Sequence, residues 1–128
     1  MSQEQMRSVV AQYFAAWSAM DPEKWVSCFA GDAMSHDPYG ATPMRGRTAL
    51  REFFGRITGA MQEITLSGAP VFTAKDRAAV QFKGQGVGKN GRVVAIEGID
   101  VFEFNGEGKI QTLWAYWDPA EVLAKLHP

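Results

Sequence analysis

This chain of 128 residues has little of what several classes of protein need. Cys28 is its only cysteine, which excludes an internal disulfide and a zinc site built from cysteines. The two histidines, His36 and His127, form no recognised metal-ligand spacing with nearby acids, so we expect no metal site. The 13 basic residues against 14 acidic ones leave a formal net charge of −1, which gives no basic surface for nucleic acid or an anionic membrane.

Long apolar runs are also missing. No stretch has the length of a membrane span, and the polar start Met1–Gln5 lacks the basic and apolar regions of a signal peptide. We therefore expect a cytoplasmic protein. What the chain does have is 46% hydrophobic and 12% aromatic residues, enough for a packed core in one domain over residues 1–128.

Helix signals come first along the chain and strand signals follow. Ser2 and Gln5 fit a capping box before apolar residues at helical spacing, which reach Trp17. The pattern predicts two further helices, from Asp21 to about 29 and from 46 to about 59. Predicted extended segments cover 33–37, 63–73, 78–89, 92–104 and 109–117, before a short final helix after 118. This order predicts an α+β fold with helices on one side of an antiparallel sheet.

Asp100 is the most informative single residue. In a strand it shares a face with Ile96, Gly98, Phe102 and Phe104, so an acid lies on an otherwise apolar side. Desolvation there disfavours the charged form, and a protonated acid acts as a hydrogen-bond donor. Such acids often take part in chemistry. The alternative is a buried acid that caps or bridges backbone groups.

Two further polar residues could meet Asp100. Tyr13 lies on the apolar stripe of the first helix, and its hydroxyl needs a partner when buried. With a protonated Asp100, it would give two donors that stabilise one oxyanion, although an ordinary core tyrosine is the alternative. Asp37 precedes Pro38 at the end of an extended segment, where a carboxylate could act as a general base or simply form a turn. His36 should then face the surface.

These residues together resemble the ketosteroid isomerase family, within the cone-shaped fold shared with nuclear transport factor two and SnoaL-like cyclases. The resemblance covers nearly the whole chain and is carried by these segments: Tyr13, Asp37-Pro38-Tyr39-Gly40, Arg45-Gly46-Arg47, Ile99-Asp100-Val101, Gly108–Thr112 and Ala115-Tyr116-Trp117. It implies a cofactor-independent isomerase. Tyr13 and Asp100 would hold a dienolate oxygen, and Asp37 would move a proton between two carbons.

The remaining predicted ligand contacts are mostly apolar. Trp117 shares its predicted strand face with Leu113 and Ala115, and with Trp17 it could form a wall against a flat ring. The resemblance places supporting tyrosines where this chain has Phe29 and Phe54. Their absence should leave Tyr13 less polarised.

The hairpin at Asn90-Gly91 raises a conflict. A two-residue loop there would set Gln81 opposite Asp100 and bring Lys83 into the cavity, with Gln85 beside it. Periodicity argues the reverse, with Val80 and Phe82 inside. Either a one-residue bulge shifts the register, or a homodimer covers an apolar outer face made by Ile99, Val101, Ile110, Trp114 and Tyr116. In the dimer interpretation, Lys83 indicates a smaller, more polar or anionic substrate.

We therefore predict an isomerase acting on a steroid-like or smaller enolisable ketone, with a small hydrophobic or moderately polar carbonyl compound as its ligand and a homodimer as its assembly. One alternative is a SnoaL-like cyclase or epoxide hydrolase, although the sequence offers no clear Asp-Arg-Asp set for the latter. Another is a dimeric ligand-binding domain without catalysis, because one fold hosts many functions.

Overall fold

The computed structural model describes residues 1–126, so His127 lies outside the described residues. It confirms the α+β class: the helices are α1 (Gln3–Ala19), α2 (Pro22–Val26), α3 (Gly46–Gly59) and α4 (Pro119–Leu126). The strands are β1 (Phe29–His36), β2 (Met44–Arg45), β3 (Met61–Ala74), β4 (Arg77–Gly88), β5 (Val93–Phe104) and β6 (Ile110–Tyr116). They form one sheet in the order β2-β1-β6-β5-β4-β3, antiparallel except for the parallel pair β1–β6.

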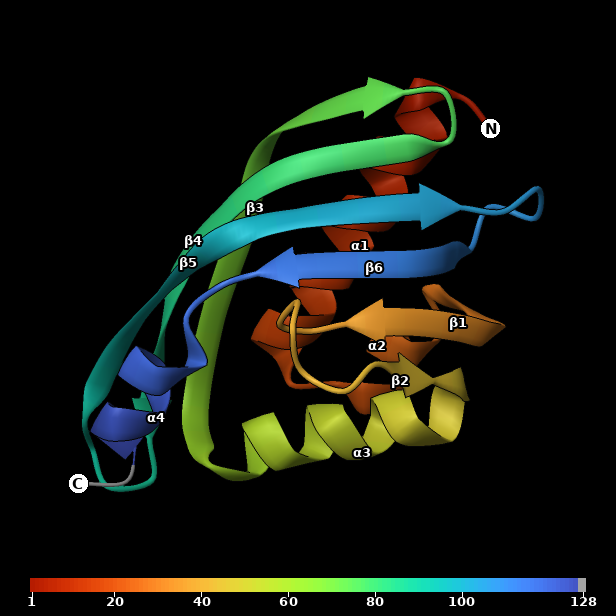
Figure 1. Ribbon diagram of the computed structural model, residues 1–128. Coiled ribbons are helices and arrows are strands. Elements are labelled where there is room, and N and C mark those ends of the chain that lie inside the picture. The colour runs from red at the N-terminus through yellow and green to blue at the C-terminus, as the bar shows by residue number, and fades with distance from the viewer. Residues whose placement is uncertain (127–128) are drawn as a thin grey trace.

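The sheet is strongly curved, and its inner face holds the core. Figure 1 shows β3, β4 and β5 bending along their length, with α1 crossing behind the sheet and α4 beside the bent ends. Helix α1 packs on β3, and α3 packs on β1. Aromatic side chains dominate the space between helices and sheet, because Trp25, Phe29, Phe54 and Phe102 are all fully buried. This arrangement leaves a space lined by side chains where the sheet bends away from the helices.

The predicted starts of the first two helices are confirmed by their caps. The Ser2 hydroxyl accepts from the Gln5 N–H at 3.0 Å, and the Gln5 side chain accepts from the Ser2 N–H at 2.7 Å. Asp21 caps α2 by accepting from the Lys24 N–H at 3.1 Å. Helix α2 ends at Val26, before the predicted boundary, because the chain already pairs with β6: the carbonyl oxygen of Cys28 accepts from the Ile110 N–H at 2.9 Å.

The predicted register of the β4–β5 hairpin is wrong by one residue. Val80 lies opposite Asp100 and Phe82 lies opposite Gly98. The loop has three residues instead of two, because the Gly88 N–H donates to the Arg92 carbonyl at 2.8 Å and Gly91 adopts a φ of 82°. A three-residue loop that ends in a left-handed residue is a common hairpin form. The one-residue shift resolves the conflict in favour of periodicity and puts Gln81, Lys83 and Gln85 on the exposed outer face.

One residue assigned to the outer face is also misplaced. Ile110 is fully buried, whereas Ile99 and Tyr116 are 48% and 46% exposed. The register between β5 and β6 shifts between Glu103 and Phe104, so Ile110 pairs with Phe104 and joins the core. Simple alternation along β6 cannot show this, because the shift reverses the face of every residue before it.

Candidate active site

A cavity of about 320 Å³ lies between the helices and the curved sheet. Its walls come from α1, α3, α4 and the strands β3 to β5, together with residues that follow β1 and β6. Most of its lining is apolar, and the polar exceptions are Tyr13, Asp37, Arg56 and Asp100. Apolar walls with a few convergent polar groups are typical of small-molecule sites.

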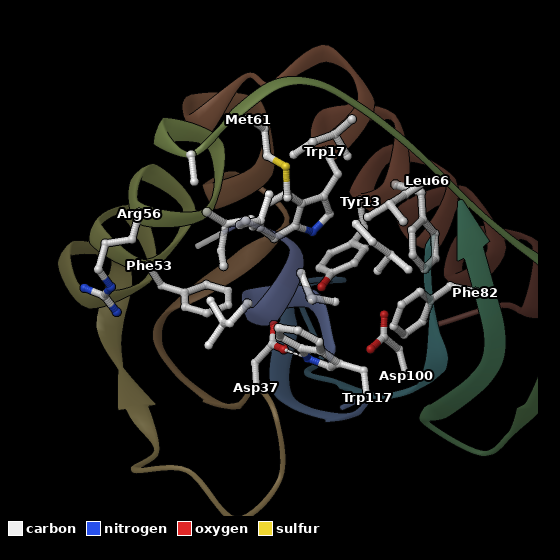
Figure 2. A pocket seen from close by; sticks show the side chains of 18 residues that line it. Tyr13, Trp17, Asp37, Phe53, Arg56, Met61, Leu66, Phe82, Asp100 and Trp117 are labelled. Atoms are coloured by element: carbon white, nitrogen blue, oxygen red, sulfur yellow. Dashed lines mark hydrogen bonds between the residues drawn. The ribbon is translucent and has the colours of Figure 1, made fainter. Parts of the chain in front are cut away.

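The cavity brings together the three polar residues that the sequence singled out. Tyr13 projects from α1, Asp100 from the middle of β5, and Asp37 from the residue that follows β1. All three are buried, with 2%, 3% and 8% of their surface exposed. Figure 2 shows the hydroxyl of Tyr13 and both carboxyl groups around the same space. They therefore face a common point. In a ligand-binding domain without catalysis, we would not expect the two acids to converge in this way.

Asp37 has one specific partner. The indole N–H of Trp117 donates to Asp37 Oδ1 at 2.6 Å, which Figure 2 marks with a dashed line. Burial raises the pKa of Asp37 from 3.8 to about 6, and the Trp117 hydrogen bond acts in the opposite direction by favouring the carboxylate. Asp37 is therefore mostly ionised at neutral pH and can accept a proton.

Asp100 differs from Asp37 although both are aspartates in one cavity. Burial, with the nearby charge of Asp37, raises the pKa of Asp100 well above its usual range. No hydrogen bond from residues 1–126 acts to lower its pKa. The same two causes, burial first and then the charges of the two acids, raise the pKa of Tyr13. The site therefore combines one acid that is mostly ionised at neutral pH with two groups, Asp100 and Tyr13, in which the surroundings favour the protonated form.

The predicted apolar contacts divide into two groups. Trp17 and Trp117 line the cavity. Phe29, Phe54, Leu113 and Ala115 are buried but stand outside the lining, so they support it from behind. The stacked rings of Trp17 and Phe54, 4.3 Å apart between centroids, show this packing.

The prediction that Lys83 lines the cavity is wrong. Lys83 is exposed on the outer face of β4, opposite Glu97, because the hairpin loop is one residue longer than expected. Phe82 takes the inward position instead. Arg56, in the last turn of α3, is the one basic residue in the cavity lining that the structure describes. Sequence spacing gave no reason to select it.

Other lining residues were missed by the sequence reasoning. Phe53 and Ile57 of α3, with Met61, Ile64 and Leu66 of β3, form one wall. Val122, Leu123 and Leu126 of α4 form another. The apolar stripe of α3 and the alternation along β3 are signals that could have found the first group. The second group could not be found in this way, because its place in the cavity depends on where α4 packs, and the spacing of apolar residues in the sequence does not show that.

Two further findings concern the described part of the chain. No group of three or more His, Cys, Asp or Glu side chains in residues 1–126 is placed to hold a metal ion. Within the same range, no helix combines the length and the apolar character needed to cross a membrane.

Comparison with known proteins places this site in a family. The pattern of the SnoaL-like domain matches residues 10–113. The chain belongs to the SnoaL-like domain family. Its fold is accordingly the nuclear transport factor two-like fold that the sequence predicted. Tyr13, Asp37 and Asp100 all lie within the matched range.

Relatives of this SnoaL-like chain include enzymes. It is 31% identical over 119 residues to the Steroid Delta-isomerase of Nocardioides simplex, covering 93% of this chain and 94% of that protein. It also resembles the solved structure of SalBIII, described as an epoxide hydrolase/cyclase-like enzyme with a role in pyran ring formation in the polyether salinomycin. That match has a TM-score of 0.82, 29% identity, and coverage of 94% and 97% of the two chains. Such relatives support a catalytic role for the SnoaL-like cavity.

Proposed function

We propose that this SnoaL-like protein is a cofactor-independent isomerase that shifts a C=C bond in a steroid-like or smaller enolisable ketone. The observation that carries the proposal is the convergence of Tyr13, Asp37 and Asp100, all buried, on a single and mainly apolar cavity. The isomerase relative supports the reaction type.

The mechanism assigns one role to each polar group. The Asp37 carboxylate takes a proton from the carbon between the carbonyl group and the double bond, which gives a dienolate. Tyr13 and the protonated Asp100 donate hydrogen bonds to the dienolate oxygen, where negative charge develops. Asp37 then returns the proton two carbons further along. Because the proton moves between carbons of one molecule, no cofactor takes part.

The cavity shape and polarity fit such a ligand. The walls are mainly apolar, and the ring of Trp117 is held in place by its hydrogen bond to Asp37. With Lys83 outside, the main reason for proposing a polar or anionic substrate is removed. A largely apolar ketone that places its oxygen near Tyr13 and Asp100 fits best.

The direct test is turnover of a β,γ-unsaturated ketosteroid, followed by the absorbance of the conjugated product. Asp37→Asn should abolish turnover, and Tyr13→Phe should reduce kcat by about 100-fold or more, as expected when one oxyanion donor is lost. Asp76→Asn is the matched control, because Asp76 is exposed in the β3–β4 turn and does not line the cavity. Absence of both ketone turnover and phenol binding would refute the proposal, since phenols mimic the dienolate.

A second candidate is cyclisation, favoured by the similarity to the SalBIII structure. The same two acids could pass a proton to and from a closing ring without forming an enolate. Hydrogen exchange between the solvent and the carbon next to the carbonyl separates the candidates. An isomerase catalyses that exchange in deuterated water. If this protein binds phenols but does not catalyse the exchange, the result would support the second candidate.

We also propose that the protein forms a homodimer through the outer face of its sheet. Ile99, Tyr116 and Tyr39 are exposed there, at 48%, 46% and 62%, although they are large and apolar or aromatic. Tyr39 and Tyr116 lie against each other, with ring centroids 5.8 Å apart. Contiguous apolar surface of this kind is typical of protein interfaces.

A further inference from the structure

Trp25 carries an unusual polar atom. Its side chain is fully buried in α2, and its indole N–H forms no well-aligned hydrogen bond with any described residue. Among residues 1–126, the only other such buried side-chain atom is the hydroxyl of Ser35. An unpaired buried donor costs about 1–3 kcal/mol, so natural proteins keep few of them. The unpaired N–H of Trp25 therefore needs a structural or functional reason.

The surroundings of Trp25 narrow the choice of acceptor. Its ring packs against Phe29 at 4.7 Å, Phe54 at 5.1 Å and Trp17 at 5.2 Å between centroids. None of these three side chains can accept an N–H hydrogen bond with an oxygen. Tyr13 is the exception, with its ring centroid 5.9 Å from that of Trp25. Among the aromatic rings of residues 1–126 that pack around Trp25, Tyr13 alone carries an oxygen.

Two indole groups have the opposite effect on Tyr13 from that of its buried surroundings. Burial and the two acids raise the pKa of Tyr13, whereas Trp17 and Trp25, as nearby N–H donors, act to lower it. The two tryptophans differ in position, because Trp17 lines the cavity and Trp25 lies behind the lining. Trp25 can therefore reach the phenol but has no cavity-facing position from which to contact a ligand directly.

We propose that Trp25 is a positioning residue for Tyr13, whose phenol oxygen accepts the Trp25 indole N–H as Tyr13 donates its own proton in a hydrogen bond to a bound oxyanion. This inference rests on the role of Tyr13 in the proposed function. Donation makes the phenol oxygen more negative, which strengthens a hydrogen bond that it accepts at the same time. Hydrogen bonds in a site often become well aligned only in the complex. The paired donor would also stop Tyr13 from rotating away from the ligand.

The variant Trp25→Phe removes the N–H and keeps an aromatic ring in the same place. We expect about a tenfold loss in phenol affinity and a similar loss in kcat, with little change in KM, as for one hydrogen bond. The Tyr13 13Cζ resonance should also shift, because it reports the electron density of the phenol. Trp114→Phe is the matched control: Trp114 lies on the outer face, against His36 and Arg77, and its loss should leave these readouts unchanged.

A double-mutant cycle separates positioning from packing. If Trp25 acts through the phenol oxygen, Trp25→Phe should have no further effect on kcat once Tyr13→Phe is present. If Trp25→Phe folds poorly, the indole 15N–1H resonance of Trp25 in the wild-type protein gives a second test, and it should move downfield when a phenol binds. The inference would be overturned if the losses in the cycle are additive and the Tyr13 resonance is unchanged. It would also be overturned if the indole resonance of Trp25 does not shift when a phenol binds.

These readouts are separable from the proposed function. If the protein turns over no ketone but the Tyr13 resonance still responds to Trp25→Phe, the proposed function fails and the pairing of the two residues stands. If ketone turnover is found but Trp25→Phe matches the Trp114→Phe control in every readout, the function stands and the pairing fails.

Discussion

Two aspartates in one cavity have different immediate neighbours, and this difference acts on their pKa values. Asp37 accepts a hydrogen bond from Trp117, which stabilises its carboxylate. Asp100 has no such donor in the described chain and also faces the charge of Asp37. The two pKa values are therefore pushed apart, and in the proposed mechanism this separates a base from a donor without any other residue type.

The first prediction concerns the pH dependence of activity. Since Asp37, as the proposed base, would act only when it is ionised, kcat/KM should fall about tenfold per pH unit below a pKa of about 6 and level off above it. Trp117→Phe removes the hydrogen bond that lowers this pKa, so its acidic limb should move to higher pH. Ketone turnover between pH 4.5 and 8 measures both. An acidic limb near pH 4 in the wild type would contradict the burial argument.

The second prediction concerns stability, where the same burial has a cost. The folded-state pKa of Asp37 lies above its ordinary value of 3.8, so the native state binds its proton more tightly than the unfolded state does. This acid therefore destabilises the fold increasingly as the pH rises from about 4 to about 6, and then by a constant amount. Asp37→Asn should recover up to about 3 kcal/mol at pH 7, from a shift of about two units.

Chemical denaturation of wild type and Asp37→Asn at two pH values tests this. The gain should vanish near pH 3.5, where both states of the wild type bind the proton. A gain of equal size at both pH values would mean that packing, and not charge, is responsible. The variant is expected to lose activity while it gains stability, because in the proposed mechanism the buried carboxylate that destabilises the fold is also the base.

At the scale of elements, the turn between β4 and β5 sets which side chains enter the cavity. Gly91 has a φ of 82°, a conformation that costs other L-residues about 1–2 kcal/mol. A side chain at Gly91 would meet nothing within 4 Å, so this conformational cost is the whole effect. We therefore predict that Gly91→Ala destabilises the protein by about 1–2 kcal/mol in urea denaturation.

Gly106→Ala provides the matched control for this turn. Gly106 also faces open space, in the β5–β6 turn, but it has no positive φ. Its substitution should change the free energy of unfolding by less than about 0.5 kcal/mol. Equal losses in the two variants would show that the left-handed conformation of Gly91 is not what holds the register.

Local signals explain which elements the sequence could predict. The capping groups of Ser2 and Asp21 lie within three residues of the helix starts that they fix, so spacing alone finds them. Tyr13 and Asp100 were found in the same way, from the apolar faces that they interrupt. What failed was a count of loop residues: one extra residue in the hairpin exchanged Lys83 for Phe82 in the cavity.

Long-range packing explains why the sequence did not predict the cavity wall formed by α4. The wall made by Val122, Leu123 and Leu126 depends on where α4 rests, more than 100 residues from Tyr13 in the sequence. That position is fixed in part by Asn90, whose side-chain amide donates to the carbonyl oxygens of Lys125 and Leu126 at 3.3 and 3.2 Å. No periodicity in either segment records this contact, since it joins a turn to the end of a helix.

At the scale of the whole molecule, the sheet has two faces with different requirements. The inner face is covered by helices and holds the cavity. The outer face carries Ile99, Val101, Trp114 and Tyr116 in neighbouring positions of β5 and β6, because Ile99 pairs with Tyr116 and Val101 pairs with Trp114. The sheet that positions Asp100 on one side thus presents an apolar surface on the other. Strand β5 therefore contributes both to the cavity and to the proposed dimer interface.

The last prediction is that Ile99→Lys converts a dimer into a monomer. Burying a lysine charge at the centre of an apolar interface without a partner is unfavourable by several kcal/mol, enough to raise the dissociation constant by 100-fold or more. Light scattering coupled to size exclusion, at several protein concentrations, measures this.

Val93→Lys is the control: Val93 is 56% exposed on the same face of β5 but lies six residues away, roughly 20 Å along the strand. If the wild type is monomeric at every concentration, or if both variants dissociate alike, the outer face is not the dimer interface. Because Asp100 follows Ile99 directly, the monomeric variant should also be assayed for phenol binding, and a retained affinity would show that the cavity forms within one chain.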